Sequence, residues 1–166
     1  MLLNWNARPL AGEIQQTLCR QGEDVLFSCP VKDRTTIVSL CGSKHLTGQQ
    51  GYLQYRFGRK GHIELEFPAQ RQGTQKMFRY AHYSRYQVNR VAVSFRKGAY
   101  TYALFDGYEG DTLPKTHYQG VQVRPSGAAR KEVTLMCRGP ALGNLSSLSS
   151  ILPCDKDDPL NMGECR

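Results

Sequence analysis

The stretch VAVSFRKGAYTYALF, residues 91–105, carries the clearest structural pattern in the chain. Apolar side chains alternate with small or polar ones on both sides of Lys97-Gly98, which predicts two antiparallel strands joined by a two-residue turn. A slip of one residue would move the apolar set to the opposite face, so the pattern favours one register. The expected opposite pairs are Phe95 with Tyr100, Val93 with Tyr102, and Val91 with Leu104.

Strand patterns also flank this hairpin on both sides, separated by turn signals and not by helical segments. Within Ile63–Phe67 the period is two, so the three apolar residues should face inward and Glu64 and Glu66 should face water. Gly139–Leu152 has room for one short helix. The prediction is an all-β chain: an antiparallel β-sandwich or barrel with disulfides and at most one short helix near the C-terminus. The other expected hairpins pair Asp24–Val31 with Thr35–Cys41, Tyr52–Phe57 with Ile63–Phe67, and Tyr118–Arg124 with Lys131–Cys137.

Length and composition are those of one globular domain: 166 residues, 40% hydrophobic and 22% charged, with a formal net charge of +8. A chain of this length can bury about 68–70% of its unfolded surface, which is enough for one core. No apolar run reaches the roughly 20 residues that span a bilayer, so we expect no transmembrane segment. Residues 1–17 lack a signal-peptide core of useful length. We expect them to form a flexible N-terminal arm and residues 18–166 to form a single β domain.

The six cysteines indicate the compartment. None lies in a C-x-x-C pair, which argues against a zinc site and against a catalytic redox pair. An even number of cysteines in a chain of this size favours three disulfides and an oxidising compartment, so the predicted location is periplasmic or secreted. Cys29 and Cys41 flank a predicted hairpin turn, which makes them the favoured local pair. The full set is Cys19, Cys29, Cys41, Cys137, Cys154 and Cys165.

Positive charge is concentrated in the middle of the chain. Between Arg56 and Lys97 there are ten Lys or Arg residues and only two acidic ones, Glu64 and Glu66. Tyrosines interleave with the arginines, a mixture that suits acidic glycans, lipid phosphates or an acidic protein partner, while export disfavours nucleic acid. Arg and Tyr are also enriched at protein interfaces. The alternative is that the aromatic residues pack inside and the arginines solvate the outer face. The candidate binding residues here are Arg79, Tyr83, Arg85, Tyr86 and Arg90.

Signals for catalysis and for metal binding are weak. The four histidines are scattered, and there is no G-x-S-x-G nucleophile motif. Glu64 and Glu66 share one strand face about 7 Å apart, a separation that two glycosidase carboxylates can have. Solvated strand positions are the simpler interpretation of these two residues. We therefore predict no catalytic residues, no metal site and no cofactor.

Parts of the chain resemble uncharacterised exported proteins of Gram-negative bacteria. The segments that carry this resemblance are Leu26–Pro30, Val38–Cys41, Gly51–Gly58 and Gly98–Phe105. The resemblance implies export and no assigned activity.

A second resemblance is to periplasmic lysozyme inhibitors, small β proteins that insert a Ser-Gly-x-x-Tyr loop into a lysozyme active site. Ser126 and Gly127 match the start of that motif, with Arg130 where the tyrosine would stand, and Gly51-Tyr52 ends a similar loop. It implies that these two loops contact an enzyme partner.

The sequence thus predicts an exported, non-enzymatic binding protein, with a lysozyme-inhibitor-like protein-binding module as the leading hypothesis. The first alternative is a binder of envelope polyanions, acidic glycan or lipid phosphate, through the basic Arg/Tyr face. The second is a cell-wall glycan hydrolase. The oligomeric state and the identity of the partner stay open at this point.

Overall fold

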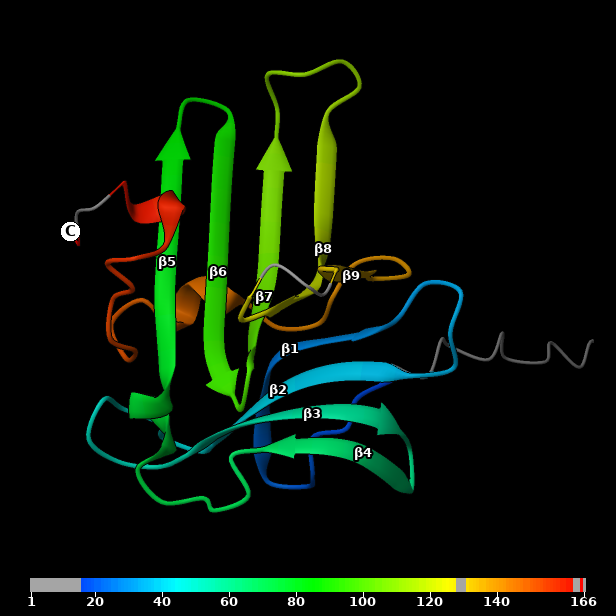
Figure 1. The fold of residues 1–166 in the computed structure, drawn as a ribbon, viewed down its shortest axis with the longest axis vertical. Helices are drawn as coiled ribbons and strands as arrows, with labels where there is room; N and C mark the ends of the chain where they lie inside the picture. Colours follow the sequence, from blue (N-terminus) through cyan, green and yellow to red (C-terminus); the bar gives the residue numbers. More distant parts are fainter. Residues whose placement is uncertain (1–15, 128–130, 163–164, 166) are drawn as a thin grey trace, which may run out of the picture.

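The computed structural model describes residues 16–127, 131–162 and 165. These residues form two antiparallel sheets that pack face to face (Figure 1). The first sheet has the order β1-β2-β3-β4 and the second β5-β6-β7-β8-β9. The predicted all-β sandwich is confirmed. The strands are β1 (Glu23–Pro30), β2 (Ile37–Ser43), β3 (Leu53–Arg59), β4 (His62–Phe67), β5 (Phe78–Arg85), β6 (Val88–Lys97), β7 (Tyr100–Glu109), β8 (Thr116–Pro125) and β9 (Val133–Met136).

Helical structure is limited to three short 3₁₀ turns in the described part of the chain, Thr74–Met77, Leu145–Leu148 and Pro159–Asn161. The second of them lies in the segment where a short helix was expected, and Asn144 caps it by accepting a hydrogen bond from the Ser146 amide. None of the helices in the described ranges is long and apolar enough to cross a bilayer.

The β6–β7 hairpin forms with the predicted faces but with a different turn. Its turn residues are Gly98 and Ala99, one position later than expected, because Lys97 pairs with Tyr100. Phe95 therefore lies opposite Tyr102, and Val93 opposite Leu104. Each residue of β6 thus pairs with a β7 residue two positions later than predicted, and an even shift keeps the apolar side chains of both strands on one face. Gly98 takes the positive φ of 57° that this turn requires, which no other residue type adopts as easily.

The two sheets meet through an aromatic core centred on Phe95. Its ring stacks on Phe67 with centroids 4.6 Å apart and on Tyr102 at 4.9 Å, and it also contacts Tyr55 and Phe78. Leucines from the segment after β9 close one side of the core. Ile63, predicted to face inward, is exposed, because β4 is the edge strand of its sheet and its first residues extend past the core.

The outer face of the four-stranded sheet buries a charged network. Arg56 is fully buried there and donates to Glu23 at 2.5 and 2.9 Å and to Glu66 at 2.7 Å. The segment before β1 covers this face: Leu18 is buried, its C=O accepts from Arg56, and its N–H donates to Ser39 Oγ. Glu66 lies on the outer face, as predicted, but it is only partly exposed to water, because two arginines, Arg56 and Arg20, bind its carboxylate.

Three disulfides form, as predicted, but the favoured pair was wrong. The bonds join Cys19 to Cys41, Cys29 to Cys137 and Cys154 to Cys165. In the β1–β2 register Cys29 lies opposite Val38 and Cys41 opposite Val25, so the two thiols of this hairpin are not neighbours. Three disulfides are typical of an oxidising, extracytoplasmic compartment. Of the predicted arm, residues 1–15 lie outside the described residues.

Candidate functional site

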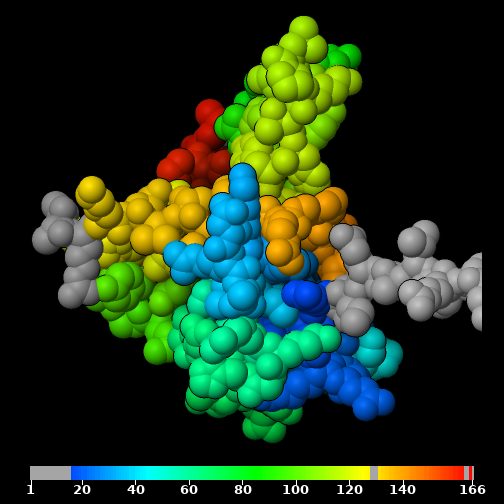
Figure 2. Space-filling view, turned by 90° about the vertical axis from the view of Figure 1, so that its right-hand side faces the viewer, coloured from blue at the N-terminus to red at the C-terminus, as the bar shows by residue number. Residues whose placement is uncertain are grey.

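The five-stranded sheet is longer than the sheet it packs against. Strands β5 to β8 rise well above the four-stranded sheet (Figure 1), and their upper part stands out as a yellow-green lobe in the space-filling view (Figure 2). We call residues 82–91 and 106–119 the distal end. Beyond Val91, which still belongs to the core, both sheet faces of the distal end are free of the opposing sheet, and the candidate stretch from Arg79 to Arg90 runs along one side of it.

The face that continues the core becomes polar in the distal end. In register, the row Tyr80, Val93, Leu104 and Val121 belongs to the core. Two residues further along each strand the row contains His82, Asp106 and Gln119 together with Val91, which is still buried in the core. The last row contains Ser84, Asn89, Tyr108 and His117. Polar side chains at core-facing positions fit a surface that no sheet covers, since burial without partners would be costly.

Hydrogen bonds join these polar side chains in pairs across the strands. A ring nitrogen of His82 lies 2.8 Å from Asn89 Oδ1, and His117 Nε2 lies 2.8 Å from Asp106 Oδ1. Gln119 donates to the second Asp106 oxygen at 2.7 Å. Within the described ranges, no hydroxyl or thiol is hydrogen-bonded to the ring of either histidine. The arrangement orders this face.

The opposite face of the distal end carries a row of aromatic and charged side chains. Arg90 donates from Nε to Glu109 at 2.6 Å, and its guanidinium lies over the Tyr83 ring, 5.8 Å from the centroid. Tyr118 donates its hydroxyl proton to the same Glu109 oxygen at 2.9 Å. Gly107 makes room for this, since a Cβ there would lie 2.2 Å from the Tyr118 ring. Hydrogen bonding from Arg90 is the main reason that the pKa of Glu109 lies below its usual value.

The two hairpin tips of the distal end are tied together. Gly110 donates its N–H to the Gln87 C=O at 2.6 Å, and Arg85 donates to Asp111 at 2.6 Å. This hydrogen bond from Arg85 lowers the pKa of Asp111. Three large apolar or aromatic side chains remain exposed at this end: Tyr86 at 85%, Leu113 at 96% and Tyr108.

Tertiary contacts neutralise part of the basic segment. Arg56, Arg85 and Arg90 each bind a carboxylate, so three of the ten cations in the segment are paired within the fold. Arg79 donates to the C=O groups of Lys76 and Phe78. As the simpler interpretation of the segment expected, Phe78 and Tyr80 are buried while Arg79 and Arg85 are exposed on the other side.

The remaining candidate residues lie elsewhere. Tyr52 donates its hydroxyl proton to Glu23 beside the buried Arg56, and Gly51 precedes it in the same loop. Ser126 and Gly127 follow β8 at the end of the sheet that holds the Gly98 turn, where the Ser126 amide donates to the Ala99 C=O. Arg130 lies outside the described residues. The two loops and the Arg/Tyr stretch therefore do not form one surface.

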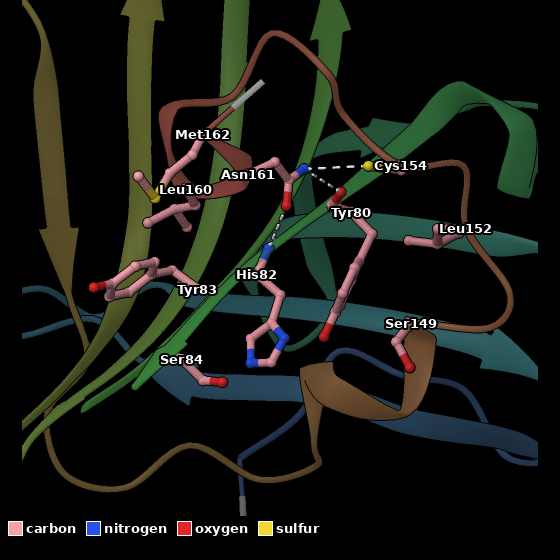
Figure 3. A pocket seen from close by; sticks show the side chains of 10 residues that line it. All are labelled: Tyr80, His82, Tyr83, Ser84, Ser149, Leu152, Cys154, Leu160, Asn161 and Met162. Carbon is pink, nitrogen blue, oxygen red and sulfur yellow. Dashed lines mark hydrogen bonds between the residues drawn. The ribbon is translucent and has the colours of Figure 1, made fainter. Parts of the chain in front are cut away.

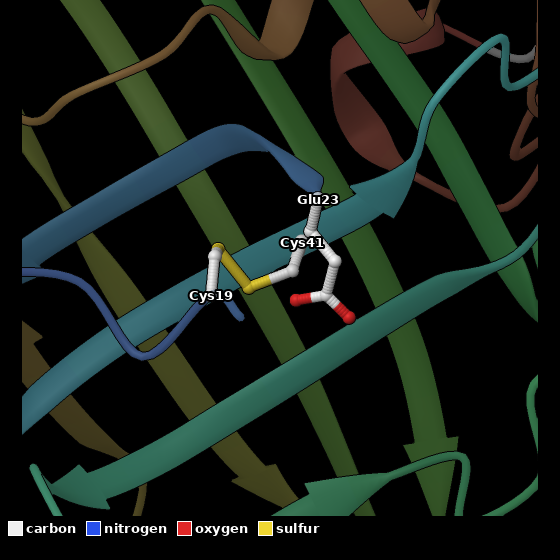
Figure 4. A group of neighbouring side chains, drawn as sticks. All are labelled: Cys19, Glu23 and Cys41. Atoms are coloured by element: carbon white, nitrogen blue, oxygen red, sulfur yellow. A yellow bond between two sulfur atoms is a disulfide. The ribbon is translucent and has the colours of Figure 1, made fainter. Parts of the chain in front are cut away.

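A carboxylate and two sulfurs come close together on the outer face of the four-stranded sheet (Figure 4). Cys19, Glu23 and Cys41 have ligand atoms within 4.8 Å of one another. The sulfurs are joined in a disulfide, and Glu23 already binds Arg56. Burial opposes ionisation of Glu23, but hydrogen bonds from Arg56, the Arg20 amide and Tyr52 outweigh it and hold its pKa below the usual value. The group is a structural ion pair beside a disulfide.

A pocket of about 440 Å³ with charged residues of both signs lies at the lower end of the five-stranded sheet, on the side that carries Arg79. Arg79, Arg96 and Arg124 line it together with three aspartates of the C-terminal segment. The three guanidiniums make no ion pair with a carboxylate among the described residues. Three arginines outside any ion pair in the described residues thus line this pocket, whereas Arg85 and Arg90 of the distal end are both paired.

A second pocket, of about 470 Å³, lies beside β5 where the C-terminal segment passes it (Figure 3). Tyr83, Ser84, Leu160 and Met162 belong to its lining, and the Cys154–Cys165 disulfide holds the segment nearby. It borders the distal end.

Sequence reasoning found the Arg/Tyr side of the distal end but missed its other parts. Asp106, His117 and Gln119 alternate with apolar or small residues, and polar residues at core-facing positions of β7 and β8 were the available signal. Leu113 follows Asp111-Thr112 in a turn-like stretch. A single apolar residue in a turn forms no periodic pattern, so nothing in the sequence marked it as a contact residue.

Comparison with known proteins gives no relative: no family model, curated protein or solved structure matches this chain.

Proposed function

We propose that this chain is an exported, non-enzymatic protein-binding module and that the distal end is its contact surface. The observation that carries the proposal is the exposure of Tyr86 and Leu113 on a projecting, internally bonded sheet end. Solvent exposure of large apolar side chains at one place is typical of interaction sites. Tyrosine is also among the residues that dominate binding energy at protein interfaces.

Rigidity and charge support a protein partner. The distal end is crossed by the Arg90–Glu109 and Arg85–Asp111 pairs and by the bond between the two tips, so little ordering is left to occur on binding. The same pairs neutralise cations that a polyanion would need. The specific form that we favour is an inhibitor of a lysozyme, in which the projecting hairpins would enter the substrate cleft.

Inhibition is tested with the purified, disulfide-bonded protein. Turnover of bacterial cell walls by lysozymes of several classes is measured with the wild type, with the double variant Tyr86→Ser/Leu113→Ser, and with Val133→Ser as control. Val133 is an exposed apolar residue on β9, away from the tips. We expect the double variant to lose inhibition about tenfold or more, since truncating a residue that dominates an interface costs about 2 kcal/mol or more. Full activity of every lysozyme with the wild type would remove the inhibitor form.

The broader protein-binding role is tested by affinity purification from an envelope extract with the same three proteins. A partner retained by the wild type and by Val133→Ser but lost by the double variant is the expected result. Equal retention by all three proteins would show that the distal end is not the contact surface.

A second candidate is polyanion binding, for which Arg79, Arg96 and Arg124 are the candidate contacts and the three aspartates of the same pocket are an opposing charge. Binding of a sulfated glycan or of anionic lipid vesicles would then weaken steeply with salt and with Arg96→Ala/Arg124→Ala. Changing the paired Arg85 and Arg90 would have a smaller effect. Indifference to salt and to the pocket variants would rule this candidate out.

A further inference from the structure

The edge of the five-stranded sheet at β5 is only partly covered. In the β5–β6 ladder alternate residues direct their backbone groups to β6, and the residues between them direct theirs outward. Tyr80 and His82 are outward residues, because their backbone groups bond to the C-terminal segment. Ser84 is the next outward residue along the strand.

The C-terminal segment already adds a short strand to the lower part of this edge. Tyr80 donates its N–H to the Pro153 C=O at 2.9 Å, and Asp155 donates its N–H to the Tyr80 C=O at 2.9 Å, which is parallel pairing. The backbone groups of β5 are therefore accessible to an extended chain.

Asn161 ends this added strand. Its side-chain Oδ1 accepts the His82 N–H at 3.0 Å (Figure 3). Its Nδ2 donates to the Asp155 C=O at 2.5 Å. The side-chain amide thus stands between β5 and the departing segment in the place of a peptide group. The Asn161 side chain bonds to the N–H of His82 but offers no further backbone groups, so the pairing of the C-terminal segment with β5 stops at His82.

Beyond Asn161 three backbone groups stay open in the described part of the chain. They are the C=O of His82 and the N–H and C=O of Ser84. They alternate as acceptor, donor and acceptor at strand spacing, and the 470 Å³ pocket lies directly beside them. Tyr83, Leu160 and Met162 give this pocket an apolar part, and Met162 is largely exposed.

We propose that the open part of β5 binds an extended segment of a partner protein by strand addition, with one apolar side chain of that segment seated between Tyr83 and Leu160–Met162. Strand addition to a free edge supplies affinity through main-chain bonds and selectivity through side-chain pockets. The inference rests on the proposed protein-binding function and adds the mode of recognition. A second copy fits less well, because its eight-residue β5 would meet the C-terminal turn at Asn161 after three backbone groups.

The test uses linear decapeptides from a random phage-displayed library, selected on the purified, disulfide-bonded protein. The tightest peptide is synthesised and its Kd is measured for the wild type, Ser84→Pro and Ser84→Ala. Proline removes the outward N–H of Ser84 and leaves the bonds to β6 intact, while alanine keeps the N–H. We expect a loss of about tenfold or more for Ser84→Pro and less than twofold for Ser84→Ala.

N-methylation of the peptide backbone, one position at a time, gives a readout that is independent of the variants. Binding should be lost at alternate positions, whose N–H groups bond to β5, and kept at the positions between them. This pattern decides the matter even if Ser84→Pro does not fold. Failure to select any peptide above a scrambled control, a second copy of the chain as the only occupant, or uniform sensitivity to methylation would overturn the inference.

Failure of this inference can be distinguished from failure of the proposed function. The variant Tyr86→Ser/Leu113→Ser should bind the selected peptide normally, since neither residue lines the pocket. Loss of lysozyme inhibition or of the partner in that variant, without peptide binding by the wild type, would leave the distal end as a contact surface and remove only the strand-addition mode.

Discussion

Replacement of Arg56 by alanine should be among the most destabilising single substitutions in the four-stranded sheet. The Arg56 side chain is 0% exposed, and the Glu23 side chain that it binds is 2% exposed. The guanidinium also donates to Gln54 at 2.7 Å and to Glu66. Alanine would therefore leave the Glu23 carboxylate buried without its cation.

The expected loss in free energy of unfolding is about 3–5 kcal/mol at pH 7, the usual cost of removing one partner of a buried ion pair. For a domain of this size that corresponds to a decrease in Tm of roughly 6–20 °C. Lysine at this position should recover only part of the loss, because an ammonium cannot reproduce the forked contacts to Glu23 and Gln54.

Urea unfolding with the disulfides intact measures the effect. Arg96→Ala is the matched control, because this exposed arginine makes no ion pair within the described residues, and its loss should be under about 0.5 kcal/mol. The double variant Glu23→Gln/Arg56→Met should recover at least half of the loss, since it removes both buried charges. A decrease of less than 1 kcal/mol for Arg56→Ala would refute the assignment of the network as structural.

The free energy of unfolding should also depend on pH in a direction set by the pKa of Glu23. The pKa of Glu23 in the fold lies below its ordinary value of 4.5, so its contribution to stability is present above that value and is lost as the pH falls through the folded pKa. In Arg56→Ala the buried carboxyl can protonate instead. The difference in stability between wild type and variant should therefore be largest near pH 7 and shrink below pH 4.5. A constant difference over this range would contradict the reasoning.

Three further substitutions test other parts of the fold. Gly107→Ala should displace the Tyr118 ring from its hydrogen bond with Glu109, visible as changed chemical shifts of that ring with a fold that is otherwise intact; an unmoved ring would contradict the close approach. Phe95→Ala should lower the free energy of unfolding by about 3–5 kcal/mol, measured in urea, and a loss below 1.5 kcal/mol would argue against its central place in the core. Replacing the pair Cys29 and Cys137 by alanine should cost about 4–5 kcal/mol by chain entropy, because the bond closes a separation of 108 residues; calorimetry that finds no change in Tm would refute this.

Local patterns in the sequence predicted the strands well. The alternation around Phe95 and Tyr102 identified the faces of the β6–β7 hairpin correctly, and only the turn position was wrong, by one residue. Gly98 can stand first or second in a two-residue turn, and both placements keep the apolar residues on one face. Periodicity alone does not distinguish them.

Long-range contacts could not be predicted in the same way. The favoured pair Cys29–Cys41 followed from proximity along the chain, whereas Cys29 bonds to Cys137 through the packing of the segment after β9 on β1. Arg56 was counted in the basic segment, yet the residues around Leu18 bury it. The partners of both residues lie at sequence distances at which no local pattern exists.

The candidate site was predictable only where it depends on local sequence. Tyr83, Arg85 and Arg90 were identified from composition, and they do lie on one strand pair of the distal end. The ion pairs of Arg85 with Asp111 and of Arg90 with Glu109 depend on the neighbouring hairpin, and they turn a predicted basic patch into a neutral, ordered face.

Residue-resolved amide hydrogen exchange of the protein, free and saturated with its tightest peptide or with an inhibited lysozyme, tests the distal end most directly. We predict that exchange of the Ser84 amide slows at least tenfold on binding, while amides at Thr47–Tyr52 and at Ser126 keep their rates. Protection confined to either of those two loops, with no change at Ser84 or at Tyr86, would contradict the assignment of the distal end as the contact surface.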